Sequence, residues 1–211
     1  MKLTKYEHAC MVLEKGDSLL VIDPGGFTMP LTDLKQVVAI VITHEHADHW
    51  TAEQLTRILE GNPAARIFGP AGVAAAAEGF AVKTVAPGDA VSVEPFELKF
   101  FGGKHAVIHS SIPIVDNVGV LVNDSFYYAG DSYALPRVEV DTLAVPVGAP
   151  WLKIGDVIDY VEAIKPRRSL PVHEAVLSTI GKNMANARVE AATVKGGGEF
   201  FPLEAEESLE L

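Results

Sequence analysis

Three histidines and an aspartate that can bind a metal ion lie within the short segment His44 to His49. The segment reads Thr-His-Glu-His-Ala-Asp-His from position 43 and follows the apolar run 37–42. Imidazole nitrogens and carboxylate oxygens are the ligands that divalent first-row metals accept. A polar loop whose histidines cap the next helix is the alternative, but desolvating these groups together is costly unless something pairs with them. The segment therefore predicts a metal site.

The spacing within this segment favours two metal ions over one. His44 and His46 lie on the same side of an extended chain, because successive side chains of a strand alternate. Asp48 and His49 follow where the chain bends toward a helix, so they face a neighbouring point. The helical HExxH zinc motif is absent, since the histidines of His-Glu-His are two residues apart. We expect one ion on the first pair and a second ion on the later pair.

Three later residues complete the expected ligand set, and each follows an apolar run that is typical of a strand. His105 follows a pair of glycines that permit a tight turn, Asp131 follows Gly130, and His173 ends the run 168–172. We expect His105 to join the first ion, His173 to join the second, and Asp131 to bridge both. His109 is the alternative to His105, which is favoured because it lies at the junction of strand and loop.

The elements that must position these residues are predicted from apolar periodicity and turn signals. A capping box at 51–54 predicts the start of one helix, and an apolar stripe marks the face of another at 154–164. Asn123-Asp124 predicts a tight hairpin. Strands are expected at the amino terminus and over 10–14, 19–22, 65–68, 82–85, 90–93, 96–101, 118–122, 126–129, 143–147, 168–172 and 199–203, and helices over 51–60, 70–78, 154–164 and 177–194.

This order of elements predicts an α/β (α+β) protein with a four-layer αββα sandwich. Strand-rich blocks with amphipathic helices toward both ends imply two packed sheets, each covered outside by helices. A doubly wound parallel sheet is the competing fold. The run of short strands between 81 and 130 argues against it, because parallel strands need crossover helices.

Length and composition limit the class of protein and its partners. The 211 residues, of which 48% are hydrophobic, predict one globular domain over 1–211. A formal net charge of −11 opposes binding to nucleic acid. Because no apolar run reaches membrane-spanning length and the amino terminus lacks a signal-peptide pattern, we expect a cytoplasmic protein without membrane contact. Cys10, the single cysteine, allows no internal disulfide, and the sequence sets no oligomeric state.

Taken together, these residues resemble the metallo-β-lactamase superfamily. The resemblance rests on HxHxDH at 44–49, a later histidine at His105, Gly130-Asp131 and a final histidine at His173, and it covers nearly the whole chain. It implies the αββα fold and two zinc, manganese or iron ions at one edge of the sheets. The start of the chain further resembles compact hydrolases related to ascorbate 6-phosphate lactonase. Where many members have Gly-His-Thr or Gly-His-Ser, this chain has Gly103-Lys104-His105-Ala106.

The expected activity is hydrolysis of a small molecule by a hydroxide that bridges two divalent ions. Two close metals can lower the pKa of a shared water toward ~7 and polarise the scissile group. Zn2+ is the expected metal, with Mn2+ or Fe2+ as alternatives, and the bond is an ester, lactone, thioester or phosphodiester. Asp48 is expected to orient the hydroxide and relay a proton, and His8 and Asp23 to hold the ligands in place. The alternative for Asp23 is a role in the Pro-Gly turn alone.

Four further residues are candidates for the wall of a substrate pocket, because they lie near the expected active loops: Trp50, His109, Tyr133 and Trp151. Two functions of other classes stay open. One is a metal-binding or ligand-sensing module without catalysis, and the other is a diiron redox protein on the same fold.

Overall fold

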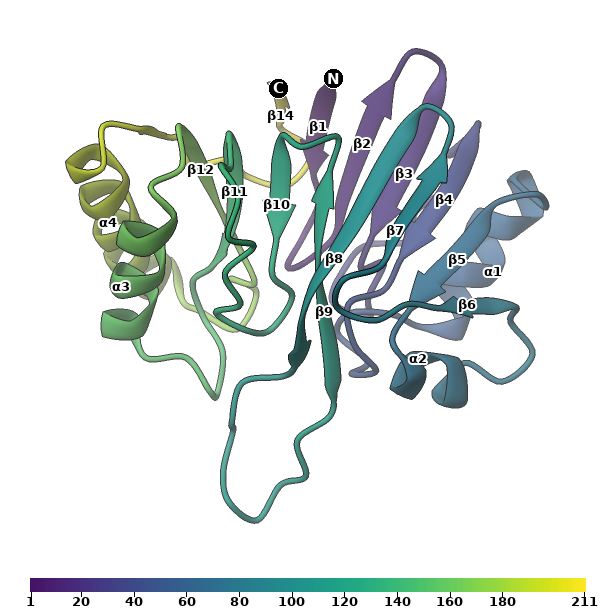
Figure 1. Ribbon diagram of the computed structural model, residues 1–211, viewed down its shortest axis with the longest axis horizontal. Coiled ribbons are helices and arrows are strands. Elements are labelled where there is room, and N and C mark those ends of the chain that lie inside the picture. The colour runs from purple at the N-terminus through teal and green to yellow at the C-terminus, as the bar shows by residue number, and fades with distance from the viewer.

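The protein consists of two seven-stranded sheets packed face to face, with a pair of helices outside each sheet (Figure 1). The structure is a computed structural model that describes residues 1–211. The first sheet has the order β14-β1-β2-β3-β4-β5-β6 and the second the order β13-β12-β11-β10-β9-β8-β7. The first sheet contains β1 Lys2–Lys5, β2 Met11–Lys15, β3 Ser18–Ile22, β4 Val37–Val41, β5 Arg66–Gly69, β6 Val82–Thr84 and β14 Ser208–Glu210.

The second sheet and the helices complete the layers. The sheet is built from β7 Ala90–Val93, β8 Phe96–Lys104, β9 Asp116–Val122, β10 Phe126–Tyr128, β11 Thr142–Pro146, β12 Arg168–Val172 and β13 Glu199–Phe200. In Figure 1 the first sheet is covered by α1 Ala52–Gly61 and α2 Ala71–Ala76, and the second by α3 Ile154–Ile164 and α4 Thr179–Lys195. No helix is both long enough and apolar enough to cross a membrane.

Three separate apolar clusters hold the layers together. The largest fills the space between the sheets, and the other two lie between each sheet and its helices. Strand β4 contributes to two of them, because Ala39 and Val41 face the central cluster while Ile40 faces the cluster under α1. This alternation follows from the period of two in a strand. The four-layer αββα fold predicted from the sequence is confirmed.

The strand directions bring the predicted ligands to one edge of the sandwich. In the first sheet β3, β4, β5 and β6 are parallel, and two antiparallel steps make β1 parallel to β3. In the second sheet β10, β11 and β12 are parallel, and two antiparallel steps make β8 parallel to β10. The carboxyl ends of all these strands therefore meet at the lower edge in Figure 1, which we call the active edge, while both termini lie at the opposite edge.

Several predicted elements differ from those in the structure. Strand β14 was not expected after 199–203, because its residues are polar and largely exposed, and it extends the first sheet by pairing with β1. Strand β6 joins the first sheet and not the antiparallel run of the second. The capping box forms only in part: Thr51 accepts a hydrogen bond from the amide of Gln54, but the Gln54 side chain instead bonds the backbone of Thr28, Met29 and Leu31.

Candidate metal centre

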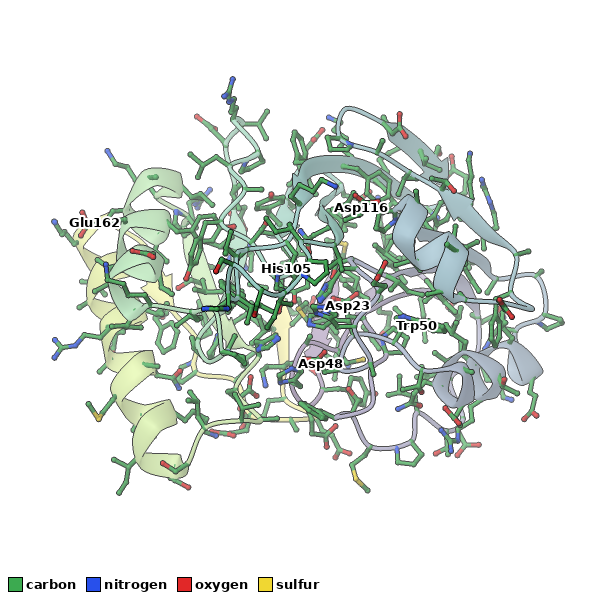
Figure 2. All side chains as sticks on the ribbon, turned by 90° about the horizontal axis from the view of Figure 1, so that it is seen from below. Asp23, Asp48, Trp50, His105, Asp116 and Glu162 are labelled. Atoms are coloured by element: carbon green, nitrogen blue, oxygen red, sulfur yellow. The ribbon has the colours of Figure 1, made fainter.

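All seven predicted ligands gather at the active edge, in the segments that follow strand ends. His44 to His49 follow β4, His105 follows β8, Asp131 follows β10 and His173 follows β12. In Figure 2, which views the molecule from this edge, the labelled Asp23, Asp48 and His105 lie near the centre, between the two halves of the sandwich. Residues more than a hundred positions apart therefore form one cluster.

The first group of possible ligands consists of His44, His46 and His105. Their nearest ring nitrogens lie within 4.8 Å of one another. Nε2 of His44 is 3.0 Å from Nδ1 of His46, and the His105 ring lies at an angle to both. This is the set predicted for the first ion. His109 is not in it, because it lies exposed in the loop after His105, where its Nδ1 pairs with Ser111.

The second group contains Asp48, His49 and His173, and it also includes His8. Oδ2 of Asp48 is 3.5 Å from Nε2 of His173 and 3.8 Å from Nε2 of His49. The predicted set for the second ion is therefore brought together. The presence of His8 among the close nitrogens was not expected, since the sequence assigned it only a supporting role.

Asp131 lies between the two groups. Its Oδ1 is 3.3 Å from Nε2 of His49, and its Oδ2 lies 3.3 Å from Nε2 of His105 and 3.1 Å from Nε2 of His173. A carboxylate in this position faces ligands from both groups, which is the arrangement that a bridging role requires. Its backbone amide donates to Oδ1 of Asn117, and Asn117 also donates to the carbonyl of Ala129.

Four of the histidines share one orientation. In each, Nδ1 faces an oxygen acceptor and Nε2 is left for the centre of the cluster. The acceptors are Oγ1 of Thr43 for His44 (3.1 Å), Oδ2 of Asp23 for His49 (2.6 Å), the carbonyl of Ala106 for His105 (2.5 Å) and the carbonyl of Gly148 for His173 (2.6 Å). Such outer hydrogen bonds fix the tautomer and the ring direction of metal-binding histidines.

The atoms that converge on the centre lack other partners. Nε2 of His49, His105 and His173 and Oδ1 of Asp131 are buried and make no hydrogen bond. Buried polar atoms without partners are rare in folded proteins. Imidazole nitrogens with carboxylate oxygens form a donor set that suits zinc, manganese or iron. The residues therefore fit a divalent metal site, in agreement with the sequence.

The pKa values of the cluster show why it favours a cation. Burial would lower the pKa of His49, but Asp131 and Asp23 outweigh that effect and raise it well above its usual value. Burial likewise opposes protonation of His173, whose pKa is nevertheless raised to about 9 by Asp131 and Asp48. Without metal the carboxylates thus hold protons on these rings. Because metal ligands must be deprotonated, metal binding has to displace those protons.

Asp23 holds His49 through a hydrogen bond on the side of the ring that faces away from the centre of the cluster. It is fully buried, its Oδ1 accepts from the amide of Thr43 and its Oδ2 accepts from the Thr43 hydroxyl, both at 2.7 Å. The same Oδ2 accepts from Nδ1 of His49. The sequence predicted a supporting role for Asp23 from its position alone. Thr43 and Asn117 were missed, because neutral polar residues at strand ends give no distinctive signal.

His8 bonds Asp48 in a defined tautomer. The amide of Ala175 donates to its Nδ1 at 3.4 Å, so the ring proton is on Nε2, which lies 3.1 Å from Oδ2 of Asp48. Burial lowers the pKa of His8 to about 4, which keeps the ring neutral at pH 7. A neutral His8 therefore donates to Asp48 and turns its carboxylate toward His49 and His173.

Of the four predicted pocket residues, two line a cavity beside the metal centre. This cavity of about 520 Å3 is bordered by Tyr133 and Trp151, and Nε1 of Trp151 donates to Oδ2 of Asp131 at 2.8 Å. Trp50 does not reach it: its ring packs in the cluster under α1 and its Nε1 donates to the carbonyl of Glu45, well to one side of the centre in Figure 2. His109 does not line the cavity either.

Comparisons with known proteins agree with this geometry. Residues 2–173 match the model of the β-lactamase superfamily domain. Protein Rv0786c of Mycobacterium tuberculosis is 36% identical over 198 residues, which cover 92% of this chain and 93% of that protein. Among solved structures, Igni18, a metallo hydrolase of Ignicoccus hospitalis, has a TM-score of 0.73 at 19% identity and covers 100% of this chain and 98% of its own.

A second structure with the same fold has a different chemistry. CmlA, a diiron β-hydroxylase of Streptomyces venezuelae, has a TM-score of 0.72 at 17% identity and covers 100% of this chain and 54% of its own. At such low identity these two structures show a common fold and not a common reaction. The family match, the fold and the site agree, and the chain belongs to the β-lactamase superfamily, with a metallo-β-lactamase fold and a candidate metal site at its active edge.

Proposed function

We propose that this protein is a dinuclear metal-dependent hydrolase, with zinc as the preferred metal, that cleaves a small molecule. The observation that carries the proposal is the convergence of buried, unpartnered nitrogens and a carboxylate oxygen from four segments on one centre. His44, His46 and His105 would hold one ion, Asp48, His49 and His173 the other, and Asp131 both. Imidazole-rich sets with carboxylates suit zinc.

When bound, such ions act as Lewis acids on the scissile group and lower the pKa of water toward ~7. The residues of the chain hold the ligands and orient the attacking water. Asp48 is half-buried and is held by His8, which directs its carboxylate toward His49 and His173, where it would orient an attacking water. Trp151 fixes Asp131 through its indole nitrogen, and Asp23 fixes His49. These contacts hold the site in place before substrate arrives.

The metal content and activity of the purified protein test this proposal. We expect about two equivalents of zinc and turnover of at least one member of a panel of esters, lactones, thioesters and phosphodiesters. Asp48→Asn should lower kcat at least 100-fold, because a ligand of the second ion and the carboxylate that orients the attacking water are both lost. Asp17→Asn, an exposed change in the β2–β3 turn, is the matched control. Equal activity of Asp48→Asn and the native protein would refute the role of Asp48.

The same measurement separates the two other functions. Iron in protein purified anaerobically, together with oxygen consumption, would indicate diiron chemistry. CmlA, a diiron β-hydroxylase, has the same fold. Full metal loading without turnover of any substrate, together with saturable binding of a metabolite, would indicate a sensing module. Either result would replace the hydrolase proposal.

A further inference from the structure

The cavity beside Trp151 is walled mainly by apolar and aromatic side chains. Its volume of about 520 Å3 is in the range of small-ligand sites. One wall comes from the loop after His105 and the other from Tyr133 and Trp151, whose rings pack edge to face with centroids 5.3 Å apart. The cavity adjoins the candidate centre through Trp151, which donates to Asp131, and through Ala106 and Ser132, which directly follow two of the ligands in the chain. The cavity is lined by Lys104, Ala106, Val107, Ser132, Tyr133, Ala134, Trp151 and Asp156.

The loop on one side of the cavity exposes further apolar side chains. It joins β8 to β9 and projects below the sheets in Figure 1. Val107, Ile112 and Ile114 in this loop are 59%, 43% and 50% exposed. Of these three, Val107 lines the cavity, and exposed apolar side chains at a concave site are typical of a ligand-binding surface.

The charges around the cavity do not favour an anionic ligand. Lys104 is the only cationic residue in its lining, and its Nζ is paired with Oδ1 of Asp116 at 2.7 Å. Asp156, the one acidic residue of the lining, faces Lys153 at 3.5 Å. Sites that recognise phosphate or carboxylate usually offer an arginine fork or a free lysine. The cavity offers neither, so an anionic group entering it would meet no unpaired cation.

We propose that this cavity is the subsite for an uncharged, apolar part of the substrate, such as a short acyl chain or an aryl group. The inference rests on the proposed hydrolase function and narrows it to neutral carboxylic esters and lactones, ahead of phosphodiesters. In the reaction, the oxygen of water bonds to the carbonyl carbon and the bond to the alcohol oxygen breaks. For an ester, the alcohol leaves with one hydrogen of the water and the acid product retains the other; for a lactone, the ring opens and both groups stay on one hydroxy acid.

Binding of a neutral dye tests the subsite independently of turnover. Nile red is uncharged, and its fluorescence increases in apolar surroundings. We expect saturable binding to both metal-loaded and metal-free protein. Val107→Asp should weaken this binding at least fivefold, and Val107→Ser should weaken it less. Val194→Asp is the matched control, because Val194 is 58% exposed on α4 and does not line the cavity. Equal weakening by Val107→Asp and Val194→Asp, or no saturable binding, would overturn the subsite.

Activity on a series of esters then tests the substrate class. With p-nitrophenyl acetate, butyrate and hexanoate, kcat/KM should rise up to roughly fourfold for each added methylene that the cavity buries. Val107→Asp should remove this dependence on chain length, and Val194→Asp should keep it. Faster cleavage of bis-p-nitrophenyl phosphate than of every ester would overturn the substrate class. Absence of all turnover with dye binding intact would count against the hydrolase proposal and leave the apolar subsite standing.

Discussion

At the residue scale, the site depends on backbone conformations that are uncommon outside glycine. His8, Asp23 and His173 have φ angles of 62°, 47° and 65°. Left-handed conformations of non-glycine residues are rare, and they are found preferentially at functional sites. Here each one directly follows a strand or lies in the turn after it, and it directs the side chain into the active edge. A hydrogen bond from the amide of His173 to the carbonyl of His8 stabilises two of them together.

Asp23→Asn tests the outer hydrogen bond on the metal ligands. Asparagine tolerates the left-handed backbone at this position, but its uncharged side chain is a weaker acceptor for Nδ1 of His49. We expect metal affinity to fall about 10-fold to 100-fold. Competition with a chelating dye measures this change. Asp33→Asn is the control, because Asp33 is an exposed aspartate with a similar φ of 63°. An equal affinity for both variants would contradict the role of Asp23.

At the scale of elements, the loop after β3 packs tightly on the metal-binding loop after β4. A Cβ atom built on Gly25 would lie 1.7 Å from the carbonyl oxygen of Asp48, and Gly26 donates to the carbonyl of Ala47 at 2.8 Å. Only glycine allows this approach. The position of Asp48 and His49 therefore depends on a residue that carries no chemistry of its own.

Gly25→Ala should displace the loop that carries Asp48 and His49. The methyl group meets backbone and not a flexible side chain, so we expect a loss of about 3 kcal/mol in the free energy of unfolding, together with weaker metal binding. Urea unfolding and metal titration measure the two effects. Gly155→Ala, in α3 with only ordinary contacts, should instead stabilise the protein by about 0.5–1 kcal/mol. Retained stability and metal affinity in Gly25→Ala would refute the close contact.

A buried ion pair fastens β1 to the loop after β12. Lys5 is fully buried and its ammonium group contacts the carboxylate of Glu174, directly after His173. Removing one partner of a buried pair leaves an uncompensated charge, so Lys5→Met should destabilise the fold by about 3 kcal/mol. The double variant Lys5→Met/Glu174→Leu should recover much of this loss, as measured by urea unfolding. Equal instability of the single and double variants would show that packing and not charge is responsible.

Much of this arrangement could be predicted from the sequence, because each ligand follows a strongly apolar strand. The pattern His44 to His49 predicted the metal, and strand directions then fixed the common edge. Strand β14 could not be predicted, since its pairing with β1 depends on contacts between the two ends of the chain. The place of Trp50 could not be fixed either, because its position in a loop beside the ligands suggested a pocket wall, although packing in a core is the more common role of a tryptophan and is the one observed.

At the scale of the whole molecule, polar contacts join the two sheets at both edges. At the active edge, Lys5 and Glu174 join them, and the amide of His173 donates to the carbonyl of His8. At the opposite edge, Arg168 of β12 contacts Asp141 and donates to the carbonyl of Glu210 in β14. A metal centre assembled from both sheets needs a fixed distance between them. The ties at the two edges supply that constraint without any ligand.

The contact of Asp141 with Arg168, which positions Arg168 for its hydrogen bond to the other sheet, should make stability depend on pH in acid. Partial burial would raise the pKa of Asp141, but hydrogen bonds and charge from Arg168, with Arg167 nearby, hold it below its usual value. Because the folded-state pKa is the lower one, the stabilisation is complete above the unfolded value of about 3.9 and is lost as pH falls through the folded value. Asp141→Asn should thus cost about 1 kcal/mol at pH 7 and progressively less below about pH 4.

Urea unfolding in EDTA at pH 7, 5 and 3.5 measures this difference without interference from metal release. Asp159→Asn is the control, because Asp159 lies exposed on α3 and makes no hydrogen bond or ion pair, so that variant should follow the native protein at every pH. If the gap between Asp141→Asn and the native protein stays constant from pH 7 to 3.5, the charge of the Asp141 carboxylate does not contribute to holding Arg168 in place. Burial and the remaining contact of Arg168 with Glu210 would then hold this edge.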